Sequence, residues 1–450
     1  MATSFYRHGW HSWSPAAWHD IARPWPRVTL PDLIINADDP EFATDPLSGS
    51  ALGAIETDGE VTLVGALDLD SRVRMADGEM IPVGGDDWMT ARGLEGAAFA
   101  SYLDTFCQRW GRRATDPGPV WCSWYSFWAN IDEDLMTKTV ADVAQFPFSV
   151  FQIDAGWERA LGDWSANSSF QSGMPAMADR IREKGLRPGL WMAPFAVHRR
   201  SELADRYSQF LLLDDGGSPV RFAHNWGEDG LALDVTRPDV LEWVRETVAS
   251  AVGWGFDYLK LDFLYAAAFP GRRRLPMGRE QGYRQAIETV RSAAGDGTFL
   301  LACGAPIMAS IGVFDAIRIG PDAAPYWEDT ARTRWLGDWS GPGARNAIAT
   351  SFNRLWLQGA ITLDPDVAFF RSRSNLLTPS QRRLGQDLAL ISGFRSTSDP
   401  PAWLDLDERN LLEEFLSDPP HVTRRSGTCF EIGGRQVNFE PVLGFEDRPS

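Results

Sequence analysis

The stretch Tyr258-Leu259-Lys260-Leu261-Asp262-Phe263 is the segment from which the fold of this chain is inferred. It is apolar at nearly every position and carries one ionisable pair, a pattern typical of a short buried strand. Residues 238–252 before it have helical periodicity, and Gly253-Trp254-Gly255 forms a short turn. Helix, turn and apolar strand make up half of a parallel α/β unit. We therefore predict that Asp262 lies at the carboxyl end of a parallel strand, where barrel enzymes carry their active sites.

Lys260 and Asp262 lie two residues apart, so their side chains share one face of the predicted strand. Lysine is rare here, with only three copies (Lys138, Lys184, Lys260) against a large number of arginines. A cation beside Asp262 would keep its carboxylate ionised, as a nucleophile requires. A structural ion pair at a strand end explains the two residues equally well, and both interpretations stay open at this point.

The composition argues against several classes of function. A net charge of −18 argues against nucleic acid or an anionic membrane as a partner. No apolar run approaches the ~20 residues of a membrane span, and the N-terminus lacks the apolar core of a signal peptide. The four cysteines and six histidines show no metal-type spacing, so we expect a cytoplasmic protein with reduced thiols and no metal. The preference for arginine over lysine suggests a bacterial source.

Turn signals and periodicity divide the chain into three parts. Residues 1–112 are predicted to form a small N-terminal β-rich domain, in which residues 54–67 are two strands around an Asp-Gly turn and residues 94–110 are a helix. Residues 118–400 are predicted to form a barrel catalytic domain. Residues 401–450 are predicted to form a short C-terminal extension with one helix and one β-hairpin.

Strand-like and helical segments alternate from Val120 onward. The candidate strands are Val120–Trp124, Ser149–Ile153, Pro188–Met192, Tyr258–Leu261, Phe299–Ala302, Ala316–Ile319, Gly359–Leu363 and Leu388–Ser392. The helical segments between them include residues 134–145, 177–184, 282–293 and 344–357. Eight such units over about 280 residues predict an α/β fold with a (β/α)8 TIM barrel. The runner-up is an open doubly wound sheet, but no G-x-G-x-x-G follows any strand.

Three of the aspartates that follow these strands are candidate site residues. Asp154 follows the second strand, Asp262 the fourth and Asp322 the sixth, while Trp157 and Trp191 belong to the ends of the second and third. Each aspartate alone is more often a cap or turn residue. The chain holds 20 tryptophans, and an indole face packs well against the C–H face of a sugar ring. Together these residues indicate a glycosidase, in which one carboxylate attacks the anomeric carbon and another protonates the leaving oxygen.

Three motifs occur in the order found in a known family: residues 153–174 (IDAGWERALGDWSANSSFQSGM), 258–263 (YLKLDF) and 318–327 (RIGPDAAPYW). On these motifs the chain resembles the α-galactosidases of glycoside hydrolase clan D, and within it family 36, the melibiase-like enzymes. The resemblance covers roughly residues 118–400. It implies that Asp262 is the nucleophile and Asp322 the acid/base.

The resemblance also implies which residues contact the sugar. They are Asp154, Trp191, Lys260, Cys303 and Gly304, to which the convergence of strand ends adds Trp157. The motif GWHSWS (residues 9–14) resembles the N-terminal region of the same family, although packing is the simpler explanation for this motif alone.

The chain departs from the family pattern in three respects. Ala155 stands where the second-strand motif commonly has a second carboxylate, and Ala305-Pro306-Ile307 replaces the glycine-rich run after the fifth-strand cysteine. The N- and C-terminal β-domains are shorter than in typical members. The first two departures leave the exact sugar open. The shortened domains leave the oligomeric state open, including a homo-oligomer.

We therefore expect a retaining α-galactosidase that acts on oligosaccharides or other α-galactosides without a metal or organic cofactor. The carboxyl groups of Asp262 and Asp322 should lie about 5–5.5 Å apart, as in retaining enzymes. Lys260 should keep Asp262 ionised, and the aromatic surroundings of Asp322 should raise its pKa.

Several alternatives stay open. Asp315, which precedes the sixth strand, is the rival acid, and Asp364 and Asp366 are more simply a turn than a cation site. The same site could transfer galactose to an acceptor sugar, as raffinose synthases do, or act on another α-linked sugar such as an α-N-acetylgalactosaminide. Outside enzymes, the remaining class is a non-catalytic sugar-binding protein, which would have no use for both an acid and a nucleophile.

Overall fold

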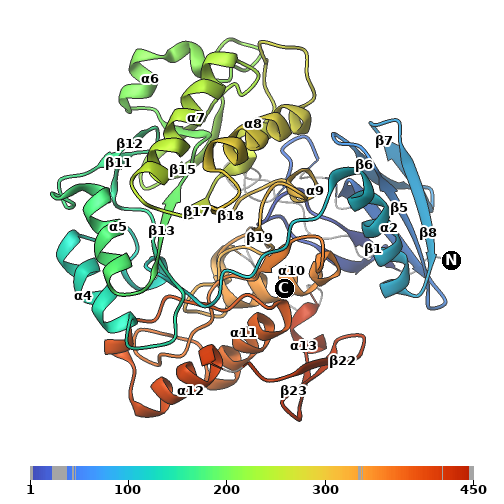
Figure 1. The fold of residues 1–450 in the computed structure, drawn as a ribbon. Coiled ribbons are helices and arrows are strands. Elements are labelled where there is room, and N and C mark those ends of the chain that lie inside the picture. The colour runs from blue at the N-terminus through green and yellow to red at the C-terminus, as the bar shows by residue number, and fades with distance from the viewer. Residues whose placement is uncertain are drawn as a thin grey trace.

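A curled sheet of eight parallel strands forms the centre of the computed structural model (Figure 1), which describes residues 4–22, 38–42, 45, 47–332, 336, 338–417 and 419–444. In chain order the strands are β9 (Val120–Cys122), β10 (Val150–Ile153), β13 (Arg187–Met192), β17 (Tyr258–Leu261), β18 (Phe299–Ala302), β19 (Ala316–Arg318), β20 (Thr362–Asp364) and β21 (Ser396–Thr397). From β9 to β20, strands that are consecutive in this order are neighbours in the sheet. Strand β21 pairs with β9, so β20 and β21 are the two edges of the sheet. The predicted (β/α)8 fold is confirmed.

Strand β17 lies at the middle of this sheet, between β13 and β18. All four of its residues are buried. The helix before it, α7 (Pro238–Gly253), has proline at its first position, where the missing N–H is not needed. Its buried residues Val240, Val244 and Val248 recur at four-residue spacing and so form one apolar face. The predicted helix, turn and strand are therefore confirmed, and Asp262 directly follows the strand.

The prediction of the eighth strand was wrong. Leu388–Ser392 is the last part of helix α11 (Pro379–Ser392), which begins with a capping box at Thr378 and ends at Gly393, whose φ is +82°. A short apolar run cannot be told from the buried face of a helix by periodicity alone. The true eighth strand, β21, has only two residues and no apolar alternation that could be recognised.

The other predicted barrel helices are present with small shifts of their ends. They are α4 (Glu133–Val143), α5 (Gly173–Glu183), α8 (Arg279–Ala294) and α10 (Ala344–Phe352). The short helical segments are α3 (Trp124–Phe127), α6 (Glu202–Arg206), η1 (Ser208–Phe210), η2 (Leu264–Ala268), α9 (Ile307–Ser310), η4 (Leu355–Leu357) and η5 (Pro401–Trp403). In the part of the chain that the structure describes, no helix is long and apolar enough to cross a membrane. The four cysteines are free thiols.

Two of the loops at the carboxyl ends of the strands carry small sheets of their own. The loop after β10 contains the pair β11 (Glu158–Ala160) and β12 (Asp163–Ala166). The long loop after β13 contains β14 (Ala196–His198), β15 (Arg221–Asn225) and β16 (Glu228–Ala232), with β16 in the middle. The same loop contains a turn at residues 214–217, in which the Gly217 N–H donates to the Asp214 carbonyl at 3.0 Å.

Smaller β-structures lie at both ends of the chain, to the side of and below the barrel in Figure 1. The N-terminal part contains β1 (Ser4–Arg7), β2 (Ala17–Asp20), β3 (Ser48–Ser50), β4 (Leu52–Thr57), β5 (Glu60–Ala66), β6 (Arg72–Ala76), β7 (Glu79–Val83), β8 (Trp88–Gly93) and helix α2 (Glu95–Trp110). The C-terminal part contains α12 (Leu406–Ser417), β22 (Val422–Ser426), β23 (Cys429–Ile432), β24 (Arg435–Asn438) and α13 (Glu440–Leu443). Both predicted hairpins are confirmed, and β22 adds a third strand to the C-terminal one.

The GWHSWS motif joins the N-terminal part to the barrel through the guanidinium group of Arg354. This buried group donates to the carbonyls of residues 9, 11, 12 and 14 at 3.1, 3.0, 2.6 and 2.8 Å, and to the Ile319 carbonyl at 2.9 Å. Ser12 adds a second attachment, because its N–H donates to the Ala305 carbonyl at 3.1 Å and its Oγ accepts from the Ala305 N–H at 3.0 Å. The motif is thus fixed to the ends of two barrel strands.

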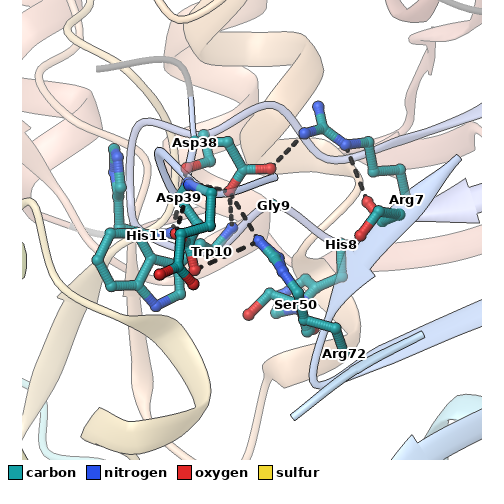
Figure 2. Close-up of polar contacts among 12 residues, drawn as sticks. Arg7, His8, Gly9, Trp10, His11, Asp38, Asp39, Ser50 and Arg72 are labelled. Carbon is teal, nitrogen blue, oxygen red and sulfur yellow. Dashed lines mark hydrogen bonds and ion pairs between the residues drawn. The ribbon is translucent and has the colours of Figure 1, made fainter. Parts of the chain in front are cut away.

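A second set of charges holds the motif from its other side (Figure 2). Asp38 accepts a hydrogen bond from the Trp10 N–H at 2.9 Å and forms an ion pair with Arg7. Arg72 lies 3.8 Å from Asp38 and 3.7 Å from Asp39. Burial would raise the pKa of Asp38, but the charges of Arg7 and Arg72 outweigh it and hold that pKa below its usual value. Asp38 therefore stays ionised and fixes the backbone at Trp10.

We expect Arg354→Met to lower the free energy of unfolding by about 3–5 kcal/mol, because several buried carbonyls would lose a charged donor. Burial lowers the pKa of Arg354 to about 10, so the native side chain is protonated at neutral pH. Urea unfolding measures the loss. Arg206→Met, whose native side chain is 69% exposed, is the matched control and should change stability by less than about 0.5 kcal/mol. Equal losses in the two variants would contradict this account.

Candidate active site

A cavity of about 340 Å³ opens at the carboxyl ends of the barrel strands. Five of the residues predicted from the sequence line it: Asp154, Trp191, Lys260, Asp262 and Asp322. The other lining residues are Trp13, Trp124, Ala155, His224, Trp226, Phe263, Arg332, Ser340 and Pro342. The volume lies at the lower end of the range of small-molecule sites. The three aspartates therefore meet at one rim, as predicted from their positions after three different strands.

Asp262 is held in one orientation by hydrogen bonds to both of its carboxylate oxygens. The indole N–H of Trp191 donates to Oδ2 at 2.9 Å, and the Phe263 N–H donates to Oδ1 at 2.8 Å. Phe263 adopts a left-handed backbone conformation with φ +50°, which is rare for an aromatic residue. Such strained positions cluster at functional sites. The arrangement presents a fixed carboxylate to the cavity, as covalent catalysis requires.

The ion-pair partner of Lys260 differs from the prediction. Its ammonium group lies 2.9 Å from Asp154 Oδ2, and the amide of Gln152 donates to the same oxygen at 2.7 Å. Burial would lower the pKa of Lys260, but the negative charge of Asp154 outweighs it, and that pKa lies well above its usual value. The cation expected beside Asp262 thus pairs with the aspartate that follows β10. Together Lys260 and Asp154 offer a donor and an acceptor at the floor of the cavity.

Asp322 lies in different surroundings from Asp262. Its side chain is 39% exposed and accepts a hydrogen bond from Arg318 Nη1 at 3.2 Å. Partial removal from water raises the pKa of Asp322, and the negative charges of Asp262 and Asp154 add to this. The positive charges of Arg318 and Lys260 act in the opposite direction but do not cancel it. The raised pKa of Asp322 agrees in direction with the expectation from the sequence.

Arg318 is a buried cation that joins three carboxylates. Besides Asp322, it lies 3.2 Å from Asp364 and 2.8 Å from Asp366. The Asp366 N–H donates to Asp364 Oδ1 at 2.8 Å, which is the turn predicted for these residues. Burial raises the pKa of Asp366 to about 7, although Arg318 opposes this shift. The described residues contain no group of three or more His, Cys, Asp and Glu side chains that could hold a metal ion.

Comparison with known proteins identifies the family. The melibiase family model matches residues 92–289. The α-galactosidase TtGalA from Thermus thermophilus, solved in complex with p-nitrophenyl α-D-galactopyranoside, is 44% identical, and the alignment covers 98% of this chain and 91% of that chain with a TM-score of 0.92. The chain belongs to the melibiase family, the GH36-type α-galactosidases.

More distant relatives share part of the chain or the fold alone. α-Galactosidase AgaA from Geobacillus stearothermophilus is 26% identical over 168 residues, which is 35% of this chain and 22% of that protein. Its crystal structure superposes with a TM-score of 0.64 at 14% identity and covers 93% of this chain and 61% of that one. The aligned segments span between 15% and 22% of the length of AgaA and of the next two curated relatives. The sequence similarity to these three relatives is therefore confined to a limited part of their length.

Three residues predicted to contact the sugar do not line the cavity. Trp157 is fully buried and donates its indole N–H to the Trp191 carbonyl at 2.9 Å, so it supports a lining residue from behind. Cys303 is also buried, and burial raises the pKa of its thiol. Gly304 has φ +53°, and a Cβ at this position would lie 3.2 Å from the ring of Trp13. The glycine is needed for the backbone conformation and for the approach of Trp13.

Several lining residues were missed because they come from outside the barrel strands. Trp13 belongs to the GWHSWS motif, for which packing is the simpler explanation from sequence alone. Trp124 follows the first strand, and His224 and Trp226 belong to the β15–β16 hairpin. The resemblance of the N-terminal motif to the family was the one sequence signal for Trp13. Nothing in the spacing of His224 or Trp226 indicated that they reach the site.

Asp315, the rival acid, is at the other end of the barrel. It precedes β19 and is buried between two arginines, with Arg113 Nε 2.8 Å from Oδ1 and Arg291 Nη2 2.5 Å from Oδ2. Its Oδ2 also accepts a hydrogen bond from the Leu300 N–H at 2.8 Å. Asp315 is therefore a structural residue that joins two arginines to the start of β18.

We expect Lys260→Met and Asp154→Asn each to lower the free energy of unfolding by about 3–5 kcal/mol, because each leaves a buried polar partner unpaired. The double variant should lose less than the sum, with a coupling energy above about 1 kcal/mol in a double-mutant cycle measured by urea unfolding. The exposed pair Arg182–Asp179, with N and O 2.8 Å apart, is the control and should give less than about 0.5 kcal/mol. Additive losses at Lys260 and Asp154 would contradict the buried ion pair.

Proposed function

We propose that this protein is a retaining α-galactosidase that hydrolyses terminal α-galactosides through a covalent galactosyl-enzyme. The observation that carries the proposal is that Asp262 and Asp322 line one cavity in unlike electrostatic surroundings. Family membership supports the choice of sugar, because TtGalA was solved with p-nitrophenyl α-D-galactopyranoside and with stachyose. Two carboxyl groups with separate protonation states are what retaining hydrolysis requires.

In the first half of the reaction, Asp262 attacks the anomeric carbon while Asp322 gives its proton to the glycosidic oxygen. The C–O bond to the leaving group breaks as the ester to Asp262 forms. The bonds from Trp191 and Phe263 fix the attacking carboxylate. The raised pKa of Asp322 keeps a larger fraction of this group protonated before the step.

In the second half, Asp322 is a carboxylate and removes a proton from water. The water oxygen attacks the anomeric carbon, the ester to Asp262 breaks, and the α configuration is restored by the second inversion. Asp154 accepts from and Lys260 donates to sugar hydroxyls at the floor of the cavity. Trp191 and Trp13 supply apolar faces for the ring. Every proton and electron pair in this scheme is supplied by the chain, the sugar or water.

The test of the proposal is hydrolysis of p-nitrophenyl α-galactoside, with the released anomer followed by NMR. We expect wild type to release α-galactose first, and Asp262→Ala to lose at least about 10³-fold in kcat because the attacking group is missing. Asp179→Ala, which removes a carboxylate that is 68% exposed on α5, is the control and should retain wild-type kcat. Release of β-galactose would overturn the retaining mechanism. Turnover of the α-N-acetylgalactosaminide alone would overturn the choice of sugar.

The role of Asp322 predicts a dependence on leaving group and on pH. Asp322→Ala should lose about 10²–10⁴-fold on melibiose, whose leaving oxygen needs a proton, and much less on p-nitrophenyl α-galactoside. Because the acid must be protonated, wild-type kcat/KM should fall as pH rises through the raised pKa of Asp322. This alkaline limb should be absent in Asp322→Ala with the nitrophenyl substrate. Equal losses on both substrates would exclude Asp322 as the acid.

A further inference from the structure

Asp366 is a buried carboxylate that takes no part in either half of the proposed reaction. It lies two residues after β20, is 2% exposed and does not line the cavity. Its φ is +83°, in the left-handed region that aspartate and asparagine tolerate better than most other side chains. Burial of a carboxylate costs free energy unless its oxygens are well hydrogen-bonded. The contacts of Asp366 therefore indicate what it does at this place.

Two polar groups contact each carboxylate oxygen of Asp366. Oδ1 accepts a hydrogen bond from the Val367 N–H at 2.8 Å and lies 2.8 Å from Arg318 Nη2. Oδ2 accepts from the Ala323 N–H at 2.8 Å and from the hydroxyl of Tyr125. Ala323 directly follows the acid in sequence. Asp366 therefore holds both the backbone beside the acid and the cation that contacts it.

Arg318 divides its positive charge among three carboxylates. Its Nη1 donates to Asp322 at 3.2 Å, its Nε donates to Asp364 at 3.2 Å, and its Nη2 lies 2.8 Å from Asp366. The Arg318 side chain is 3% exposed, so water and salt screen these interactions little. One cation cannot neutralise three carboxylates. The charges of the other two therefore decide how strongly Arg318 stabilises the ionised form of the acid.

The protonation states of Asp366 and Asp322 depend on each other. Burial raises the pKa of Asp366 to about 7, Arg318 opposes this shift, and the negative charge of Asp322 adds to it. Repulsion between two charges is mutual, so an ionised Asp366 also raises the pKa of Asp322. Loss of the Asp366 charge would act twice on the acid, because it would remove this repulsion and leave more of the charge of Arg318 to Asp322.

Other elements also bring charged and titratable groups to the acid. The charge of Lys260 lowers the pKa of Asp322, and those of Asp262 and Asp154 raise it. Of the groups around the acid in the described part of the chain, Arg318 and Tyr125 are the two that also contact Asp366. Further titratable groups near the acid or in the cavity wall are Cys303, Tyr326 and Arg332, of which Arg332 is paired with Asp338.

We propose that Asp366 is a positioning residue for the acid, which limits how far Arg318 can stabilise the carboxylate form of Asp322. The proposal rests on the proposed function and concerns the acid of the same site. Asp366 acts through Arg318 and through the backbone at Ala323, and because it is buried outside the cavity it does not touch the sugar. Its negative charge lets Asp322 keep a proton for the glycosidic oxygen although a cation lies 3.2 Å away.

The test is the pH dependence of kcat/KM for melibiose in Asp366→Asn. Asparagine keeps the size of the side chain and tolerates positive φ, but it removes the charge. The acid should then lose its proton more readily, so the alkaline limb of the profile should move about 0.5–1 pH unit toward lower pH. A merely structural role would lower kcat/KM at every pH and leave the limb in place.

Tyr125→Phe is a second variant, which keeps every carboxylate and every cation. Without the hydroxyl donor Asp366 takes up a proton more easily, so the limb should move in the same direction by a smaller amount. In the Asp366→Asn background the same substitution should cause no further shift, because the charge that it acts on is already absent. An equal shift in both backgrounds would contradict transmission through Asp366. If Asp366→Asn fails to fold, the direction of the limb in Tyr125→Phe decides.

Asp387→Asn is the matched control. The Asp387 side chain is 1% exposed and paired with Arg383 and Arg435, but it contacts neither Arg318 nor the acid. Its substitution also removes a buried charge and should leave the alkaline limb at the pH found for wild type.

The possible failures are separate from one another. An unmoved limb in Asp366→Asn, a shift toward higher pH, or an equal shift in Asp387→Asn would overturn the assignment of Asp366. A wild-type profile without an alkaline limb, or a limb that persists in Asp322→Ala, would overturn the role of Asp322 in the proposed function, and the inference with it.

Discussion

The carboxyl end of the barrel concentrates negative charge, and two buried cations hold it together. Lys260 pairs with Asp154. Arg318 pairs with Asp322 and also with Asp364 and Asp366 at the end of β20. Carboxylates placed this close in a region of low dielectric would repel each other strongly or take up protons if the cations were absent. The two cations contact their carboxylates differently. Lys260 forms a buried ion pair with Asp154, whereas Arg318 contacts the partly exposed side chain of Asp322. Removal from water raises the pKa of Asp322, and the charge of Arg318 opposes this without cancelling it.

The barrel supplies the charged floor of the site, and elements outside it supply the mouth. Trp13 comes from the N-terminal motif, and Trp226 from the hairpin after β13. This division is common in barrel enzymes, where rigid strands position the reacting groups and loops decide what may bind. Among the described residues, the N-terminal part contributes Trp13 to the cavity, and Arg354 and Asp38 hold in place the motif that carries it.

The strongly patterned parts of the sequence predicted their structures well. Strand β17 and helix α7 have clear periods, and the aspartates after β10, β17 and β19 could be placed at one rim because parallel strands bring their carboxyl ends together. The partner of Lys260 could not be predicted in this way. Inward side chains of a barrel meet those of alternate strands in layers, so Lys260 on β17 reaches across β13 to the residue after β10. Strand β21 was not predicted because two residues show no periodicity. The turn that carries Trp226 was not predicted because the residue before its glycine is not the asparagine usual in such turns.

The contact between Arg354 and the first residues of the chain also has a consequence for biosynthesis. The carbonyl of Gly9 and its donor are separated by 345 positions, so the loop that this contact closes contains most of the chain. Contacts of such long range form late, after the entropy of the intervening segment has been overcome. During synthesis, the segment that carries Trp13 leaves the ribosome long before Arg354, so this contact forms only after the sixth barrel strand and the helix after it have emerged. The wall that carries Trp13 is therefore made long before Arg354, one of the residues that fix it.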